Sequence, residues 1–197
     1  MTGKMTLAAV TALALGAVAC KQEGTTVSNN VSGSTDQTDE PGVANLGANA
    51  AAPGGMQMNP QQFAETAAGS DLFEIATGKL AQQKGSSAAV KSFGGMLVDE
   101  HTKSSNELKA AAAKVPGVAL PVVPPPQLQA RIDALNGLSG EAFDRQFIAD
   151  QTASHQQTLT ALNAYAATGT AQPLKEHAAR ATGVVQKHLN ELNQLQQ

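Results

Sequence analysis

Apolar side chains recur at steps of three and four in four long segments of the chain, and this spacing constrains the fold more than any other feature. Residues three and four apart lie on one side of an α-helix, so each segment predicts a helix with one apolar face. The sequence therefore predicts an all-α protein. The four stripes are Phe63, Ala67, Phe73, Ala76 and Leu80; Val90, Phe93, Leu97, His101, Ser104, Leu108, Ala111 and Val115; Phe143, Phe147, Ile148, Gln151, His155, Leu159, Leu162 and Tyr165; and Leu174, His177, Ala181, Val184, His188, Leu192 and Leu195.

Residues that start or stop helices stand at the ends of these segments. Polar side chains accept hydrogen bonds from the free N–H groups of a first turn, proline is tolerated in that turn, and glycine ends helices. The predicted starts are Asn59-Pro60 with Gln62 as a capping box, Ser86 or Ser87, Ser139, and Pro173; the predicted stops are Gly85, Pro116 and Gly169.

A proline-rich stretch separates the second segment from the third. About eleven residues with the rise of a polyproline helix span roughly 34 Å, which is the length of a helix of about two dozen residues. A short helix over residues 127–136, with Leu128, Ile132 and Leu135 facing inward, extends this connection. We therefore expect a four-helix bundle with a long Pro-rich crossover between helices two and three, which is the ferritin-like arrangement.

The first nineteen residues have the features of a signal peptide. Lys4 precedes a short apolar run from Leu7 to Ala19, and the only cysteine of the chain, Cys20, follows Ala17-Val18-Ala19. A run of this length is too short to span a bilayer and ends in the small residues that a signal peptidase requires. The segment resembles a bacterial lipoprotein signal, which implies lipidation of Cys20 and attachment to the membrane. Cleavage of the same bond by the ordinary signal peptidase is the alternative.

The resemblance to lipoproteins also implies a location, because Lys21 rather than aspartate follows the cysteine. It points to a periplasm-facing lipoprotein of the outer membrane, whereas an unlipidated chain would be a soluble periplasmic or secreted protein. Residues 20–59 then form a lipidated, disordered tether, since their small and polar side chains cannot offset the entropy of ordering. Residues 60–197 form the helical domain.

Charge and cysteine content exclude several classes of protein. The net charge is -3 and no basic run occurs, so nucleic-acid binding is not expected. A chain whose one cysteine is Cys20 forms no internal disulfide, so the domain depends on its core for stability. No second apolar segment after the signal is long enough to cross a membrane. The sequence identifies no protein partner.

Several motifs along the helical segments resemble a known family of ferritin-like bacterial envelope proteins, grouped as domain of unknown function 4142. The resemblance covers residues 63–192 and implies a ferritin-like fold in a secreted or membrane-attached protein, without an activity. The motifs that carry it are Phe73-Glu74-Ile75, Gly78-Lys79-Leu80-Ala81, Val90-Lys91-Ser92-Phe93, Met96-Leu97-Val98-Asp99-Glu100-His101, Leu108, Phe143-Asp144, Gln151, His155 and His188-Leu189.

All four histidines of the chain lie on the apolar stripes, where an imidazole needs either a hydrogen-bond partner or a ligand. His177 is predicted to be peripheral because it lies eleven residues from His188. The remaining three, with Glu74, place one candidate ligand on each helix: Glu74, His101, His155 and His188. Imidazoles with a carboxylate suit a first-row transition metal such as zinc, copper, iron or nickel.

The sequence leaves two functions open. The first is a binding module that holds a metal ion or small ligand within the bundle. The second is a non-catalytic structural or partner-docking envelope protein, whose core histidines only stabilise the fold. An enzyme is not favoured, because a di-iron oxidase needs Glu-x-x-His pairs. The carboxylates near His101 and His155, namely Asp99, Glu100, Asp144 and Asp150, lack that spacing, and Glu100 with Glu107 predicts a solvated face.

Overall fold

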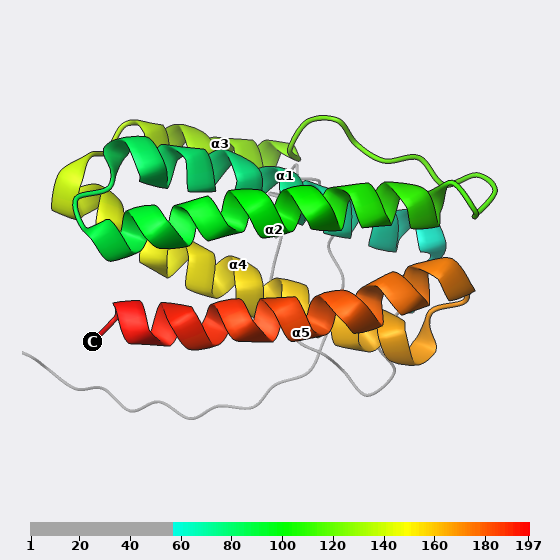
Figure 1. The fold of residues 1–197 in the computed structure, drawn as a ribbon. Coiled ribbons are helices and arrows are strands. Elements are labelled where there is room, and N and C mark those ends of the chain that lie inside the picture. The colour runs from blue at the N-terminus through cyan, green and yellow to red at the C-terminus, as the bar shows by residue number, and fades with distance from the viewer. Residues whose placement is uncertain (1–56) are drawn as a thin grey trace, which may run out of the picture. The chain divides into compact units, whose positions relative to one another are not determined.

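Five α-helices make up the part of the chain that the structure, a computed structural model, describes, which is residues 57–197 (Figure 1). The predictions for the signal peptide, Cys20 and most of the tether concern residues that lie outside this range. The all-α helical bundle predicted from the spacing is confirmed. The helices are α1 (Pro60–Lys84), α2 (Ala88–Ala112), α3 (Pro126–Asn136), α4 (Gly140–Thr168) and α5 (Gln172–Leu195).

The four long helices pack as a ring of neighbours. Helix α1 contacts α2 and α4, and α5 contacts the same two helices, so each long helix has two neighbours. Helices α1 and α5 run in one direction and α2 and α4 in the other (Figure 1). Since α2 and α4 are parallel, the chain has to return along the whole bundle between them. This requirement explains why the middle connection is long and the two outer connections are short.

The crossover runs from the end of α2 to α3, and α3 then packs against α1 and α4. Helix α2 ends at Ala112, three residues before the predicted end at Val115. The backbone after Ala112 continues as a tighter, 3₁₀-type turn, because the N–H groups of Lys114 and Val115 donate to carbonyls three residues earlier. Helix α3 begins at Pro126, one residue before the predicted start.

The predicted caps are confirmed at two of the helix starts. Asn59 Oδ1 accepts from the N–H of Gln62 at 2.9 Å, and Gln62 Oε1 accepts from the N–H of Asn59 at 3.0 Å, which completes the capping box of α1. At α2 the cap is Ser87, whose hydroxyl accepts from Val90 N–H at 3.0 Å. Ser139 precedes α4 but its side chain makes no capping bond.

Two glycines allow α1 and α2 to approach closely. A Cβ atom on Gly94 would lie 2.6 Å from the Cβ of Ala81 and 2.7 Å from the carbonyl oxygen of Gly78. A Cβ atom on Gly78 would in turn lie 2.6 Å from the carbonyl oxygen of Gly94. The two backbones therefore touch at this level, and only a residue without a side chain fits at either position.

Buried side chains form two apolar clusters. Phe63, Leu108, Leu162 and Tyr165 belong to the first, where the rings of Phe63 and Tyr165 stack with centroids 4.0 Å apart. The second cluster contains Phe93, Leu97, Phe143, Phe147 and Leu192. A third set of buried side chains is polar and comes from all four long helices: Asp71, Glu74, Thr77, His101, Gln151, Ser154, His155 and His188.

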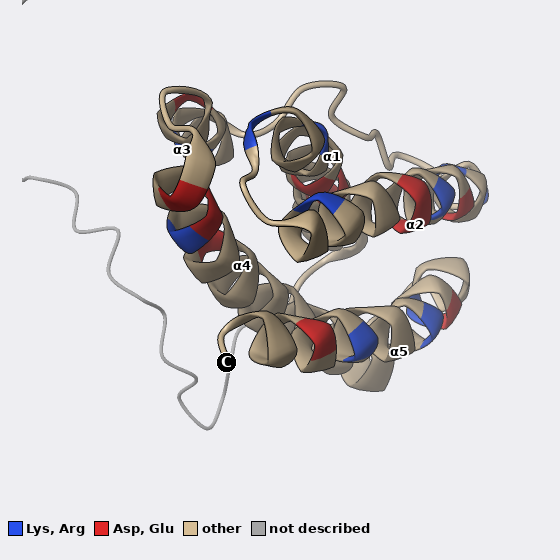
Figure 2. Cartoon of the chain, turned by 60° about the vertical axis from the view of Figure 1, so that its left-hand side comes forward, with Lys and Arg blue, Asp and Glu red and all other residues tan. Residues whose placement is uncertain are grey.

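The charged residues are spread over all the helices with both signs mixed (Figure 2). In residues 57–197 no helix is both long enough and apolar enough to cross a membrane.

Candidate metal centre

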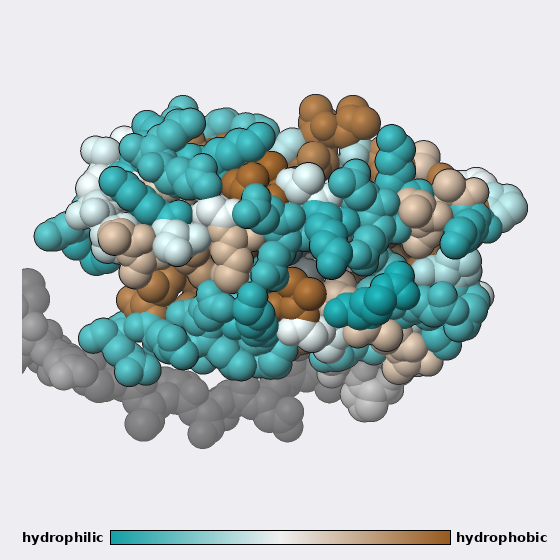
Figure 3. Space-filling model, viewed as in Figure 1, coloured by the Kyte–Doolittle hydropathy of each residue, from teal (hydrophilic) through white to brown (hydrophobic). Residues whose placement is uncertain are grey.

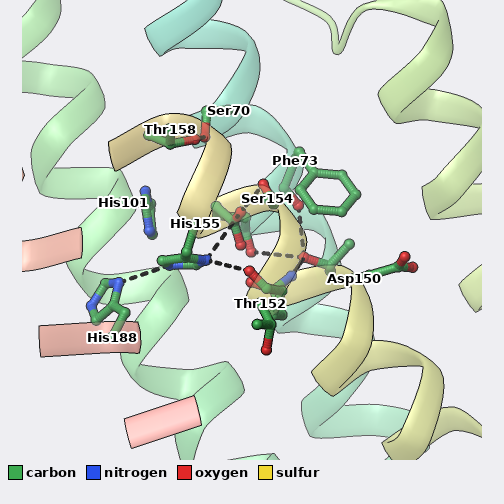
Figure 4. Close-up of polar contacts among 12 residues, drawn as sticks. Ser70, Phe73, His101, Asp150, Thr152, Ser154, His155, Thr158 and His188 are labelled. Atoms are coloured by element: carbon green, nitrogen blue, oxygen red, sulfur yellow. Dashed lines mark hydrogen bonds and ion pairs between the residues drawn. The ribbon is translucent and has the colours of Figure 1, made fainter. Parts of the chain in front are cut away.

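Three histidines from three helices meet in the bundle interior. His101 comes from α2, His155 from α4 and His188 from α5, and their exposed fractions are 4%, 1% and 0%. One ring nitrogen of each lies within 4.8 Å of the corresponding nitrogens of the other two. The three rings face one another across the gap between their helices (Figure 4).

The nitrogen on the far side of each ring has its own hydrogen-bond partner. His101 Nδ1 lies 2.8 Å from Asp71 Oδ1, and His155 Nδ1 lies 2.9 Å from the carbonyl oxygen of Gln151. His188 Nε2 lies 2.8 Å from Glu100 Oε2. A carboxylate or a carbonyl oxygen accepts a hydrogen bond, so each partner places the N–H of its histidine on the outer side. Metal-binding histidines almost always have such partners, which fix the tautomer and aim the other nitrogen at the ion.

The two inner nitrogens of His155 and His188 are 3.0 Å apart. Burial, assisted by the positive charge of His101, lowers the pKa of His155 to about 3 and that of His188 to about 4. Both rings are therefore neutral near pH 7. With their protons held on the outer nitrogens, His155 Nε2 and His188 Nδ1 present two lone pairs to each other. Such an arrangement is repulsive unless a cation lies between or beside them.

His101 completes the set with a third inner nitrogen. Its Nε2 atom is buried and has no hydrogen-bond partner among the described residues. Burial by itself lowers the pKa of His101, but the hydrogen bond that its Nδ1–H donates to Asp71 and the negative charges of Glu74 and Asp71 raise it above its ordinary value. Asp71 is held in turn by the hydroxyl of Ser105 at 3.3 Å. The negative side chains around the three rings favour a positive charge at this place.

The distances suit an ion that binds nitrogen. Nitrogen ligands of zinc lie about 2.0–2.1 Å from the ion, so two of them can be no more than about 4.2 Å apart. The nitrogens of His155 and His188 meet this limit at 3.0 Å. The widest pair, within 4.8 Å, can exceed this limit by about 0.6 Å even for nitrogens on opposite sides of the ion, so the rings have to move closer together when a four-coordinate ion binds.

Glu74, the fourth predicted ligand, lies beside the three histidines but does not belong to the group of converging atoms. Its Oε1 atom accepts from the hydroxyl of Ser154 at 2.8 Å and is 3.7 Å from His155 Nδ1, the outer nitrogen of that ring. Burial raises the pKa of Glu74 to about 7, against the opposing charge of His101. The structure thus brings three of the four predicted residues together and places Glu74 behind one of them.

The prediction for His177 is half right. It lies outside the group of three, as expected, but it is 2% exposed rather than peripheral. The candidate carboxylates of α4 are engaged elsewhere: Asp150 pairs with Arg131 at 3.2 Å, and Asp144 accepts from the N–H groups of Ser86 and Ser87.

Two residues that contact the histidines were not predicted to take part in the site. Asp71, the partner of His101, precedes Glu74 by three residues and so shares its face of α1. That spacing is the signal that could have found it. Glu100 was predicted to be a solvated residue, which is wrong: its two carboxylate oxygens bind His188 and Lys187, each at 2.8 Å. Nothing in the local sequence indicates that its side chain reaches α5.

Comparison with known proteins identifies the family of this helical domain. A family model for a domain of unknown function (DUF4142) matches residues 45–195. The chain belongs to the DUF4142 family. The match confirms the resemblance drawn from the helical motifs. No curated protein and no solved structure matches the chain. Since the DUF4142 description carries no activity, function has to be argued from the site itself.

Proposed function

We propose that this DUF4142 domain binds one transition-metal ion through His101, His155 and His188. The observation that carries the proposal is the facing pair of nitrogens, His155 Nε2 and His188 Nδ1, 3.0 Å apart on rings whose other nitrogens are already hydrogen-bonded. An ion accepts both lone pairs at once and also engages the unpartnered Nε2 of His101. Binding therefore removes a repulsion and satisfies a buried polar atom.

The ligand set indicates which ions fit. Three imidazole nitrogens, once His101 has released its proton, suit zinc, copper, iron or nickel, whereas calcium and magnesium require oxygen ligands. Three protein ligands also leave at least one position of a four-coordinate ion for water or another small molecule, which is the pattern of metal sites that act on a ligand. We therefore place the domain among metal-binding modules and assign it no reaction.

Metal content of the purified protein tests this proposal. The full chain is prepared without a polyhistidine tag, exposed to zinc, copper, nickel or ferrous iron, freed of excess metal and analysed by mass spectrometry for bound metal. We expect about one ion per chain, and a higher melting temperature with the preferred ion. His101→Ala, His155→Ala and His188→Ala should each reduce the bound metal severalfold.

A matched control is available within the same bundle. His177→Ala removes another buried histidine from α5 but leaves the three converging nitrogens untouched. Metal content equal to that of the unchanged chain is expected for this variant. Absence of bound metal from the unchanged chain, or an equal loss in His177→Ala, would contradict the proposal. Either result would favour the alternative in which the histidines share a proton and only stabilise the fold.

We also propose that the protein is an envelope lipoprotein anchored through Cys20. The apolar run from Leu7 to Ala19, with the only cysteine of the chain directly after Ala17-Val18-Ala19, supports this proposal. Mass spectrometry of the mature protein isolated from bacterial membranes should find Cys20 as the acylated first residue. The Cys20→Ser variant should leave the membrane fraction. An unmodified Cys20 in a soluble mature chain would contradict the anchor.

A further inference from the structure

A cavity of about 430 Å³ opens between α2 and α5 and reaches the bundle interior. Its buried walls include Ala67 from α1, Leu162 from α4 and Val185 from α5. The surface that carries α2 and α5 is largely hydrophilic, with apolar side chains between the two helices (Figure 3). The volume is within the range of small-molecule sites, and the buried walls suit an apolar group.

The polar side chains of the inner wall offer little to a ligand. The hydroxyl of Thr158 lies 2.9 Å from the hydroxyl of Ser70, so it already has a hydrogen-bond partner. His177 also lines the cavity, but its Nδ1 atom is closed off from the open space. The inner part of the cavity therefore selects for an apolar group, and any polar recognition has to come from nearer the surface.

The mouth of the cavity is formed by Lys103 and Glu107 of α2 and Arg180 of α5, whose side chains are 79%, 39% and 58% exposed. Glu107 lies 4.0 Å from Lys103 Nζ and 3.9 Å from Arg180 Nε. Hydrogen bonds between nitrogen and oxygen are about 2.7–3.2 Å long. One carboxylate is thus shared by two cations and is hydrogen-bonded to neither, which leaves one positive charge uncompensated at the mouth.

The other charges that line the cavity are paired one to one. Glu100 lies 2.8 Å from Lys187, and Asp71 lies 2.8 Å from His101. The surplus positive charge of the lining therefore belongs to the mouth, where an anionic group can reach it from the solvent. A guanidinium group pairs with a carboxylate through two parallel hydrogen bonds, which favours a carboxylate as that group.

We propose that this cavity binds a small monocarboxylate with an apolar chain. The chain lies against the walls formed by Ala67, Leu162 and Val185, and the carboxylate lies at the mouth, where Arg180 and Lys103 donate hydrogen bonds to it. A short fatty acid has this chemistry. The inference goes beyond the metal site and does not depend on it, since neither cation belongs to the group of converging histidines.

Binding of four matched probes tests the proposal on the full chain. Hexanoate, hexanol and hexylammonium share one chain and differ in the charge of the head group, whereas acetate has the carboxylate without the chain. Each is titrated into nitrogen-15-labelled protein at pH 7 with chelator present, and the amide resonances are followed. We expect hexanoate to shift the amides of cavity residues and to bind about threefold more tightly than hexanol. Hexylammonium should bind more weakly than hexanol, and acetate roughly tenfold or more below hexanoate, because the chain is not buried.

Variants of the mouth separate the role of charge from that of the apolar walls. Arg180→Gln and Lys103→Gln should each weaken hexanoate binding about threefold and leave hexanol binding unchanged. Glu107→Gln removes the competing carboxylate and should strengthen hexanoate binding by a similar factor. Arg145→Gln makes the same change of charge on α4, away from the cavity, and should leave the binding of both probes unchanged.

A change within the cavity tests the position of the chain. Ala181→Phe fills the space and should abolish binding of hexanoate and hexanol, whereas Ala179→Phe makes the same change at an exposed position of α5 and should have no effect. The inference is overturned if hexanoate shifts no cavity amide, if hexanol binds as tightly as hexanoate, or if the preference survives in the double variant Lys103→Gln/Arg180→Gln. That double variant changes only exposed side chains, so the test holds even where Ala181→Phe does not fold. Because chelator is present throughout, these outcomes are separable from a failure of metal binding.

Discussion

His155 Nε2 lies 3.0 Å from His188 Nδ1, and the opposite nitrogens of the two rings are held by the carbonyl oxygen of Gln151 and the carboxylate of Glu100. The contact joins α4 to α5, and Glu100 joins α5 to α2. Two hydrogen bonds thus decide which nitrogen of each ring is free. The chemistry of the site depends on these outer partners as much as on the histidines themselves.

Glu100→Gln should weaken metal binding while the fold is retained. Glutamine has the size of glutamate, but its amide group can donate to His188 Nε2 and so move the ring proton to Nδ1, where an ion would bind. Loss of such an outer partner typically costs 10–100-fold in affinity. Competition with a chelating dye measures the dissociation constant. Glu107→Gln, a change on the same helix outside the histidine cluster, should bind as the unchanged chain does; equal affinity in both variants would contradict the role of Glu100.

The contribution of His177 to the stability of the domain should fall as the pH is lowered below about 6.5. Burial lowers the pKa of His177 in the folded state, with Asp71 opposing, Arg180 adding to the effect and Glu107 opposing. The unfolded chain therefore takes up a proton on this histidine at a higher pH than the folded one does. The resulting stabilisation is complete above the unfolded pKa and is lost as the pH falls through it towards the folded pKa.

Urea unfolding at pH 7, 6 and 5, with chelator present, measures this dependence. The free energy of unfolding should decrease less between pH 7 and pH 5 in His177→Phe than in the unchanged chain, because one buried group no longer titrates. An unchanged slope in His177→Phe would show that His177 takes up its proton equally in both states.

Two substitutions of glycine by alanine should have opposite effects on the free energy of unfolding, because one glycine lies where α1 and α2 touch and the other lies at an open position. Gly94→Ala introduces a Cβ atom 2.6 Å from the Cβ of Ala81, so the helices have to separate, at a cost of about 1–3 kcal/mol. Gly183→Ala, within α5, meets no atom within 4 Å and should stabilise by about 0.5–1 kcal/mol through its helix propensity. Thermal unfolding compares the two, and a neutral Gly94→Ala would mean that the helices are not in backbone contact.

Asp144 on α4 forms hydrogen bonds with the backbone directly before α2. Its two carboxylate oxygens accept from the N–H groups of Ser86 and Ser87 at 2.9 and 2.8 Å. Asp144→Ala leaves both donors without this partner and should cost about 1–2 kcal/mol in the free energy of unfolding. Asp99→Ala, at an exposed position within α2, serves as control and should change stability by less than about 0.5 kcal/mol. Equal effects of Asp144→Ala and Asp99→Ala on the free energy of unfolding, measured by chemical denaturation, would contradict this role of Asp144.

The sequence by itself determined the helices and most of the face that each one turns inward; Val184 is an exception, since it was predicted to face the core but is 38% exposed. Spacing of three and four depends only on the helical repeat, and capping depends on neighbours a few residues away, so Asn59 and Ser87 could be recognised without a partner helix. The same periodicity placed His101, His155 and His188 on inward faces. The proline-rich crossover indicated that one connection had to run the length of the bundle.

Only the tertiary structure decided which inward-facing residues of different helices lie at the same height along the bundle and so contact one another. The axial position of one helix against another is set by close contacts such as Gly78 against Gly94, which no local pattern reports. That register brings three histidines together, leaves Glu74 behind His155, and carries the side chain of Glu100 to His188. A long side chain on an apparently solvated face can cross to a neighbouring helix, and the distance it must cover is a property of the packed bundle alone.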